Sequence, residues 1–413
     1  MKMTQRIRGA AAITAVALAG GLLAVPGHSG AATTLRIWTD ADRKTAITKV
    51  ANVWGKKNGV TIEVVQKDFG KIRDDLKTVD AATAPDVIVG AHDWVGELSA
   101  NGSVLPLKVS VASASKIPSY ALDAFSYATP AGKKVLYGVP VVLENIGLVV
   151  NTAIAKVPTS FANFESQALA FQNKASGNIG VAVPQGSAGD AYHMYPFFSG
   201  LCGYVFGKDA KGNLDPTDVG VANKKFLANA AQIEAWNKSG FLNSKLDYGT
   251  GKTAFLAGKA AFWLTGPWEA DTLKKSGLKF KIVQVPANKC QSVPFLGVQG
   301  FLVTKFAKTH GVESSAKDLV ANHMLGASGQ LALASANGRA PANTDAAAKV
   351  DDVVLKQFAA ASAGGVPMPN IPAMSAVWGE LGLAWVKTTK GAGAEAAKAT
   401  FSAAARNIKA KVG

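Results

Sequence analysis

The chain has 413 residues, 48% of them apolar, and its 44 basic and 28 acidic residues give a formal net charge of +16. The apolar content excludes an intrinsically disordered chain, and the length exceeds what one hydrophobic core usually organises, so two domains are expected. A positive charge can serve nucleic acid, a membrane surface or an anionic ligand, but the lysines are scattered, which favours a solvated surface and no nucleic-acid partner.

The first thirty residues have the pattern of a removable export signal. They begin with three basic residues, Lys2, Arg6 and Arg8. An apolar run over residues 10–25 follows, and the small residues at 29–31 suit a signal peptidase. The run is shorter than the about 20 residues that span a bilayer, which disfavours a retained anchor. We therefore expect a signal peptide over residues 1–31, cleaved near Ala31, and a periplasmic or secreted mature protein.

Strand and helix patterns alternate from residue 34 onward. The predicted elements are a strand over 34–38, a helix including 47–54, a strand over 60–65, a helix over 72–82 and a strand over 86–90. Gly59 is the expected end of the first helix. Strand, helix, strand, helix and strand in this order predict a mostly parallel sheet covered by helices.

The same kind of alternation returns later in the chain. We predict strands over 147–150, 179–183, 260–264, 280–285 and 300–303, a helix over 223–238, and a mainly helical tail from residue 316. No internal repeat, low-complexity block or flexible linker separates the two expected domains. The chain is therefore expected to cross between two lobes more than once.

The cysteine inventory is small. Cys202 and Cys290 are the only two cysteines. Outside the cytoplasm an isolated pair is more often a disulfide than two free thiols, so we expect the disulfide, with two buried thiols as the alternative. The sequence contains no C-x-x-C and no histidine pair at ligand spacing, so no metal site is predicted.

Motifs of common enzymes are missing from the sequence. The histidines form no H-E-x-x-H, and no serine stands in G-x-S-x-G. Residues 249–253 have the letters of a phosphate-binding loop, but Leu246 stands where the first glycine of that motif belongs. A helix start is the better interpretation of this stretch. No catalytic residue and no cofactor is predicted.

Carboxylates and tryptophans follow several predicted strands and turns. They are Asp42, Asp93, Glu144, Asp190, Trp94, Trp268 and Trp378. In open α/β sheets, ligands gather beyond the carboxyl ends of the strands. Sugars need carboxylates that accept from hydroxyl groups and flat aromatic rings against their C–H faces. Taken singly, each residue is more readily a surface carboxylate or a core tryptophan, so these residues alone indicate only a two-lobed ligand-binding protein.

Several stretches resemble the maltose/maltodextrin-binding proteins, the solute receptors of carbohydrate ABC importers. The most specific is MPNIPAMSAVW over residues 368–378. The other matching stretches, in the order of the family, are 36–38, 85–88, 91–93, 138–144, 218–221, 266–268 and 294–298. Together they cover nearly all of the mature chain.

The resemblance implies an α/β, two-lobed periplasmic-binding-protein fold of type II, with the ligand cleft between lobes joined by several crossovers. It places the N-terminal lobe at residues 33–142 and 291–340, and the C-terminal lobe at 143–290 and 341–413. It implies a monomer without enzymatic activity or cofactor that captures an oligosaccharide, with maltose or a maltodextrin favoured. The implied partner is the membrane permease of an ABC importer.

The resemblance also assigns roles to single residues. Five polar residues match positions that bind sugar hydroxyls in the family: Asp42, Arg43, Asp93, Glu144 and Asp190. At two of these positions the side chain differs, since the family has Lys in place of Arg43 and usually Glu in place of Asp190. Three aromatic residues match stacking positions: Tyr192, Trp268 and Trp378.

The sequence departs from the family pattern at several positions of this site. Gly90 replaces a tryptophan, and Trp94 replaces an arginine four residues on, so Trp94 is included in the predicted site as a substitute aromatic. His193 replaces an aromatic residue, while Gly379 and Gly382 replace a tyrosine and an arginine. These departures keep trehalose, cyclodextrin, a longer maltodextrin or another glucoside as alternative ligands.

Two other classes of function compete with a sugar receptor. A glycosidase would need two carboxyl groups about 5–10 Å apart on either side of one bond, and sequence does not fix the spacing of Asp42, Asp93 and Glu144. A receptor for peptides or anions would use the basic charge, but would leave the tryptophans and carboxylates without a purpose.

Overall fold

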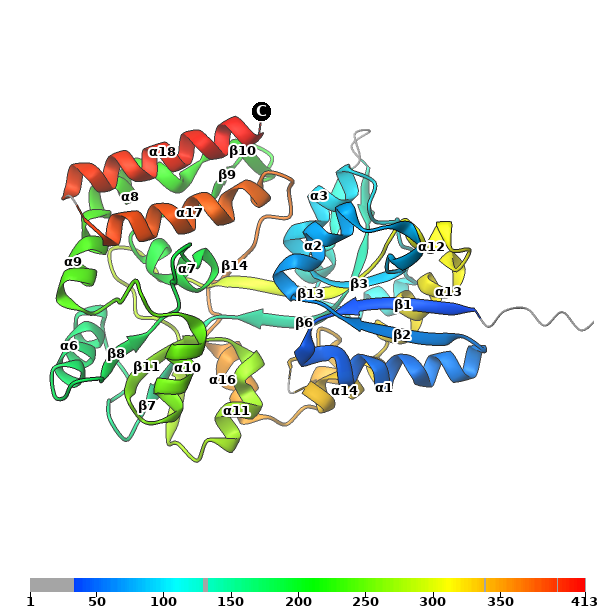
Figure 1. Ribbon diagram of the computed structural model, residues 1–413, viewed down its shortest axis with the longest axis horizontal. Helices are drawn as coiled ribbons and strands as arrows, with labels where there is room; N and C mark the ends of the chain where they lie inside the picture. The colour runs from blue at the N-terminus through cyan, green and yellow to red at the C-terminus, as the bar shows by residue number, and fades with distance from the viewer. Residues whose placement is uncertain (1–32, 129–132, 338, 392, 413) are drawn as a thin grey trace, which may run out of the picture. The chain divides into compact units, whose positions relative to one another are not determined.

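The computed structural model describes residues 33–128, 133–337, 339–391 and 393–412 (Figure 1). The predicted signal peptide and its cleavage site near Ala31 lie outside these residues. Within the described ranges, no helix is both long enough and apolar enough to cross a membrane.

The first sheet is centred on parallel strands from the N-terminal part of the chain. β1 (Thr34–Thr39) pairs in parallel with β2 (Thr61–Gln66) on one side and with β3 (Val87–Ala91) on the other. The intervening helices are α1 (Ala41–Asn58) and α2 (Phe69–Thr78). The order of elements predicted for this stretch is confirmed.

Local signals set the two ends of α1. The side chain of Asp40 accepts a hydrogen bond from the backbone N–H of Arg43 and caps the first turn. The helix ends at Gly59, which adopts a φ of 67°. Glycine takes this left-handed conformation without a steric penalty, so the end predicted from sequence is confirmed.

Strands from distant parts of the chain complete the first sheet. β13 (Phe295–Val303) runs antiparallel to both β3 and β6 (Gly138–Asn145), and it pairs in parallel with β14 (Val366–Pro367). The three strands predicted from the first stretch, β1, β2 and β3, are parallel as expected. The antiparallel pairings that make the sheet mixed come from β13, which enters from the second sheet without a crossover helix.

The second sheet has four strands in the order β12-β7-β11-β8. They are β7 (Gly147–Asn151), β8 (Ile179–Ala182), β11 (Ala260–Thr265) and β12 (Phe280–Val283). β11 pairs in parallel with β8 and antiparallel with β7, which also pairs antiparallel with β12. All four strands were predicted, although β12 is shorter than expected.

Among the described residues, nine α-helices belong to the part of the fold that contains the second sheet. They are α6 (Phe161–Gln172), α7 (Ala191–Gly200), α8 (Lys224–Asn229), α9 (Ala231–Ser239), α10 (Tyr248–Leu256), α11 (Ala270–Lys275), α16 (Val353–Ala360), α17 (Met374–Thr389) and α18 (Ala394–Val412). Of these, α6, α10 and α16 pack directly on its strands. The helix predicted over 223–238 is two helices, α8 and α9, with a break at Ala230. Residues 249–253 lie within α10, in agreement with the helix-start interpretation.

The remaining α-helices and strands are short, apart from one longer helix. The helices are α3 (Val95–Ala100), α4 (Val111–Ala114), α5 (Ser119–Ala124), α12 (Phe306–Thr309), α13 (Glu313–Asp318), α14 (Ala327–Asn337) and α15 (Thr344–Ala347). The strands are β4 (Ser126–Ala128), β5 (Lys134–Leu136), β9 (Phe206–Lys208) and β10 (Leu214–Val219), which form two hairpins.

The chain passes between the two sheets more than once, as expected. A single buried residue, Ile146, connects β6 of the first sheet to β7 of the second. β12 of the second sheet leads into β13 of the first, and β6 and β13 lie side by side (Figure 1). A third segment, residues 339–342, contacts β6 and pairs with it through a bridge between Pro341 and Val142. These three crossover segments meet at one place.

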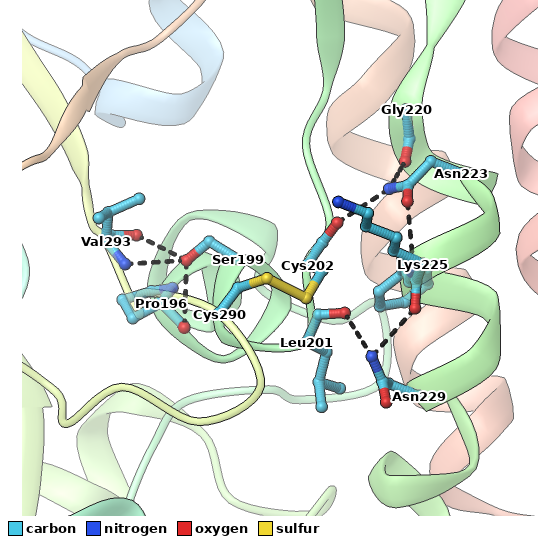
Figure 2. Close-up of a disulfide and its surroundings, with 11 residues drawn as sticks. Pro196, Ser199, Leu201, Cys202, Gly220, Asn223, Lys225, Asn229, Cys290 and Val293 are labelled. Atoms are coloured by element: carbon cyan, nitrogen blue, oxygen red, sulfur yellow. Dashed lines mark hydrogen bonds between the residues drawn. A yellow bond between two sulfur atoms is a disulfide. The ribbon is translucent and has the colours of Figure 1, made fainter.

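A disulfide joins Cys202 to Cys290, 88 positions apart in sequence (Figure 2). It links the residues after α7 to the segment that leads into β13. The same two segments are also held by Ser199, whose hydroxyl donates to the carbonyl of Val293 and accepts from its N–H, at 2.9 and 3.0 Å. The bond therefore reinforces a contact that other interactions also make.

Candidate functional site

A cleft of about 630 Å³ is lined by residues of the first sheet, by Tyr192 on α7 and Trp268 in the turn after β11 of the second sheet, and by a crossover segment. Residues 40–43 follow β1, and residues 66–69 lie at the end of β2 and the start of α2. The other lining residues are Glu144, Tyr192, Trp268, Gln299 and Arg339. Five of the predicted binding residues, Asp42, Arg43, Glu144, Tyr192 and Trp268, are therefore brought together here.

Asp42 and Arg43 follow the end of β1. The Arg43 side chain is buried, whereas the Asp42 side chain faces solvent. The Arg43 guanidinium lies 2.7 Å from a carboxylate oxygen of Asp40 and donates to Gln299 Oε1 at 3.3 Å. Burial, followed by repulsion from Arg339, lowers the pKa of Arg43. The Asp42 side chain is 73% exposed. Asp42 is thus an available acceptor, whereas Arg43 is already engaged.

Glu144 is buried at the centre of a charged cluster. One of its carboxylate oxygens accepts from Arg339 Nη1, and the other accepts from Gln299 Nε2 at 3.2 Å. Neither Arg339 nor Gln299 was predicted from sequence. Gln299 has a detectable signal, since it is the only polar residue in the apolar stretch of β13, but nothing marks Arg339. In the described part of the chain, no group of three or more metal-binding side chains is placed to hold an ion.

Trp268 is held by a chain of hydrogen bonds. Its indole Nε1 donates to the hydroxyl of Tyr248 at 2.6 Å, and that hydroxyl donates to Glu269 Oε1 at 2.7 Å. Lys252 pairs with the same carboxylate at 2.8 Å. A β-carbon on Gly266 would lie 2.1 Å from the Trp268 ring, so only glycine fits beneath it. The orientation of the ring is therefore fixed before any ligand arrives.

Tyr192 stands beside Trp268. The two ring centroids are 6.3 Å apart, and Tyr192 also stacks on Phe295 at 6.3 Å with an interplanar angle of 15°. Burial, followed by the negative charge of Glu144, raises the pKa of Tyr192 well above its ordinary value. Its hydroxyl therefore keeps its proton and can donate a hydrogen bond in the cleft.

Trp94 fills the space left by the glycine at position 90. A β-carbon on Gly90 would lie 2.8 Å from the Trp94 ring, which is buried and has its centroid 5.0 Å from that of Phe69. Phe69, which was not predicted, lines the cleft, and the Arg43 guanidinium lies 4.7 Å from its ring centroid. Trp94 thus lies behind the lining, and the aromatic group on this side of the cleft is Phe69.

Asp93 and Trp378 are not among the residues that line the cleft, and they form a hydrogen bond with each other. The indole Nε1 of Trp378, on α17, donates to Asp93 Oδ2 at 3.1 Å. Asp93 lies in a short turn after β3 and is 6% exposed. Burial raises the pKa of Asp93 to about 6. The bond joins the first sheet to the helices around the second.

Asp190 and the two glycines of α17 also lie outside the lining of the cleft. Asp190 caps α7 by accepting from the backbone N–H of His193 at 2.9 Å, and its other oxygen lies 2.7 Å from His193 Nδ1. A β-carbon on Gly189 would lie 2.1 Å from the carbonyl oxygen of Gly382. Where the family has an arginine, this chain packs α17 directly against a turn. Gly379 faces open space.

Two α/β parts connected by crossovers, with a cleft lined from both, define a class of proteins that bind a ligand between two lobes. A family model described as bacterial extracellular solute-binding protein matches residues 49–363. The chain belongs to the bacterial extracellular solute-binding proteins.

Individual relatives and a solved structure are similar over most of their length. A maltodextrin-binding protein of Bacillus subtilis, MdxE, is 28% identical over 90% of this chain and 90% of its own. A maltooligosaccharide ABC transporter solute-binding lipoprotein of Streptococcus pneumoniae is 27% identical over 83% and 81%. The structure of a Thermus thermophilus maltotriose binding protein bound with maltotriose has a TM-score of 0.79 at 27% identity, covering 92% of this chain and 100% of that one.

Proposed function

We propose that this protein captures a maltooligosaccharide in the cleft and delivers it unchanged to the permease of an ABC importer. The observation that carries the proposal is the pairing of chemistries in one cleft. Trp268 and Tyr192 offer aromatic faces, while Asp42 and Arg339 offer an acceptor and donors for hydroxyl groups. The names of the relatives and of the solved structure support the same class of ligand.

The lobes that would close on the sugar are residues 33–142 with 291–340, and residues 143–290 with 341–413. β14 and the end of β6 pair in the first sheet although they fall within the second lobe, because the crossovers share these strands. We propose a monomer, with the signal peptide cleaved near Ala31. Sugar that touches both lobes favours the closed state by its difference in affinity for the two states.

Catalysis is the rival for the same residues. A glycosidase needs one carboxyl group that gives a proton and a second that acts as base or nucleophile. In the cleft, both oxygens of Glu144 accept hydrogen bonds from Arg339 and Gln299, an arrangement that suits a structural acceptor. The sugar recovered after long incubation should therefore be unchanged by chromatography. Product that accumulates in proportion to protein would contradict a transport receptor.

Calorimetry tests the binding. Maltose, maltotriose, longer dextrins, trehalose and cyclodextrins are titrated into the mature protein. Trp268→Ala should weaken binding of the preferred sugar by about thirtyfold, the usual cost of about 2 kcal/mol for an aromatic anchor. Tyr120→Ala is the control, since Tyr120 is 40% exposed on α5 and is not part of the lining. Absence of binding across the panel would refute the proposal.

Small-angle scattering tests the closure. The radius of gyration should decrease when the preferred sugar saturates the protein, because a hinge between two lobes brings their masses together. Scattering curves that superimpose with and without sugar would contradict the closure of the two lobes but not the binding of sugar.

A further inference from the structure

Glu144 lies where the three crossover segments meet. It pairs in register with Gly297 of β13, and the preceding residue, Leu143, donates its backbone N–H to the carbonyl of Ala340 at 3.0 Å. Arg339 and Gln299, which hold the Glu144 carboxylate, come from the other two crossover segments. One buried carboxylate therefore ties together all three connections between the sheets.

The guanidinium of Arg339 has two different ends. Nη1 is bound to Glu144, and the side chain is 6% exposed. Nη2 forms a long ion pair with Asp42, 3.6 Å from its Oδ2, which is beyond hydrogen-bond range. Asp42 and Arg339 both line the cleft. The rigid fork of arginine can hold one partner with Nη1 and offer Nη2 to another.

A hydroxyl group in the cleft can bridge Arg339 Nη2 and Asp42 Oδ2 from one side. It accepts through its oxygen and donates through its hydrogen, so it can accept from Nη2 and donate to the carboxylate. A carboxylate in this place would face the negative Asp42, and an ammonium would face the positive Arg339. The chemistry of the pair selects a neutral polyhydroxyl ligand.

We propose that Arg339 is a specificity-determining residue that binds one sugar hydroxyl together with Asp42, and that Glu144 and Gln299 are positioning residues for it. This inference rests on the proposed function. Because Arg339 belongs to a crossover segment, the contact places the ligand on the element that would bend when the lobes close. Lysine cannot replace it, since a point charge on a flexible stem cannot hold Glu144 and reach a second partner in a fixed direction.

The test pairs protein variants with altered sugars. Calorimetry compares maltotriose with its series of monodeoxy derivatives on the wild-type protein and on Arg339→Lys. We expect the variant to bind maltotriose about tenfold more weakly, the effect of one lost charge-assisted hydrogen bond. For one monodeoxy derivative we expect the wild type to bind about tenfold more weakly than it binds maltotriose. Arg339→Lys should bind the same derivative at most about twofold more weakly than it binds maltotriose, because the variant already lacks the partner of the missing hydroxyl.

Two further variants keep the outcome clear. Arg36→Lys is the matched control, since Arg36 on β1 pairs with Glu63 on β2 and does not line the cleft; its affinities should equal those of the wild type. If Arg339→Lys does not fold, the double variant Arg339→Met with Glu144→Gln removes both charges of the buried pair and takes its place.

Each result has one meaning. Affinity like the wild type in Arg339→Lys would overturn the inference, and so would an equal loss for maltotriose and every derivative, which a merely structural role produces. If the wild-type protein binds no maltotriose, the proposed function fails and the inference falls with it. If the wild type binds but position 339 has no effect, only the inference falls.

Discussion

The indole Nε1 of Trp378 donates a hydrogen bond to Asp93 Oδ2 at 3.1 Å, across 285 positions of sequence. The bond connects α17 to the turn after β3. The resemblance assigns both residues to the sugar site, so each already has the other as a polar partner. A sugar that stacks on the Trp378 ring uses the ring face and leaves this hydrogen bond in place, whereas a sugar hydroxyl that donates to Asp93 Oδ2 would share that oxygen with the indole.

The pH dependence of folding should report the burial of Asp93. Burial raises its pKa to about 6, above the ordinary value of about 3.9 for an unfolded chain. Stability from this group is then fully present below about pH 4 and is lost as the pH rises through about 6. Between these pH limits, the free energy of unfolding of the wild type should fall by on the order of 3 kcal/mol relative to that of Asp93→Asn.

Urea unfolding at a series of pH values measures this difference, since other titrating groups are common to both proteins. Asp351→Asn is the control, because the Asp351 side chain is 93% exposed. A difference between wild type and Asp93→Asn that stays constant from pH 4 to about 7 would contradict the assignment.

Phe69 and Trp94 should respond differently to truncation. Trp94→Ala removes a buried side chain behind the lining, so it should destabilise the fold by about 3–5 kcal/mol. Phe69→Ala removes an aromatic face of the cleft and should weaken sugar binding by about tenfold with a smaller cost in stability. Denaturation and calorimetry on both variants check this. Equal loss of affinity at equal stability would mean that Trp94 contacts the sugar directly.

Tyr248 should act through the orientation of Trp268. Tyr248→Phe removes the acceptor of the Trp268 N–H, and we expect binding to weaken about threefold to tenfold, the value of one net hydrogen bond. Tyr204→Phe is the matched control, since the Tyr204 hydroxyl donates to Asp218 at 2.9 Å outside the lining. Calorimetry measures both. Unchanged affinity in Tyr248→Phe would show that packing alone holds the ring.

The disulfide should stabilise the fold but have no effect on the affinity of the cleft for sugar. Unreduced protein should take up no alkylating label and reduced protein two, as mass spectrometry would show. Closing a loop of 88 positions contributes about 4–5 kcal/mol in the chain-entropy model, so reduction should lower the melting temperature. A double variant, Cys202→Ser with Cys290→Ser, should bind sugar with the affinity of the wild type, and its melting temperature should be the same with and without reductant. Labelling of the unreduced protein would exclude the bond.

Much of the fold was predictable because its signals are local. The strand at β1, the helix end at Gly59 and the apolar stretch of β11 each follow from a few adjacent residues. The antiparallel place of β13 was not predictable, because it depends on pairing with β3, far away in sequence. Neither the residues of β3 nor those of β13, taken alone, indicate which strand they pair with or in which register.

The site was predictable only where the resemblance supplied positions. Asp42, Glu144, Tyr192 and Trp268 do line one cleft. Arg339 and Phe69 were missed because an arginine after a helix and a phenylalanine at a helix start are common, and only the fold places them at the cleft. The resemblance also placed Trp94 by position, whereas the direction of its ring depends on the glycine at 90.

The pairing of β3 with β13 also affects the order in which the protein acquires its structure. β3 is complete once residue 91 has been made, but its neighbour in the sheet is not complete until residue 303. The first sheet therefore stays open on one side through most of synthesis, because the four strands of the second sheet, all between residues 147 and 283, are made before β13. Folding rates fall as contacts become more distant in sequence. We expect the first sheet to form slowly and late, only after the whole of the second sheet and β13 have been made.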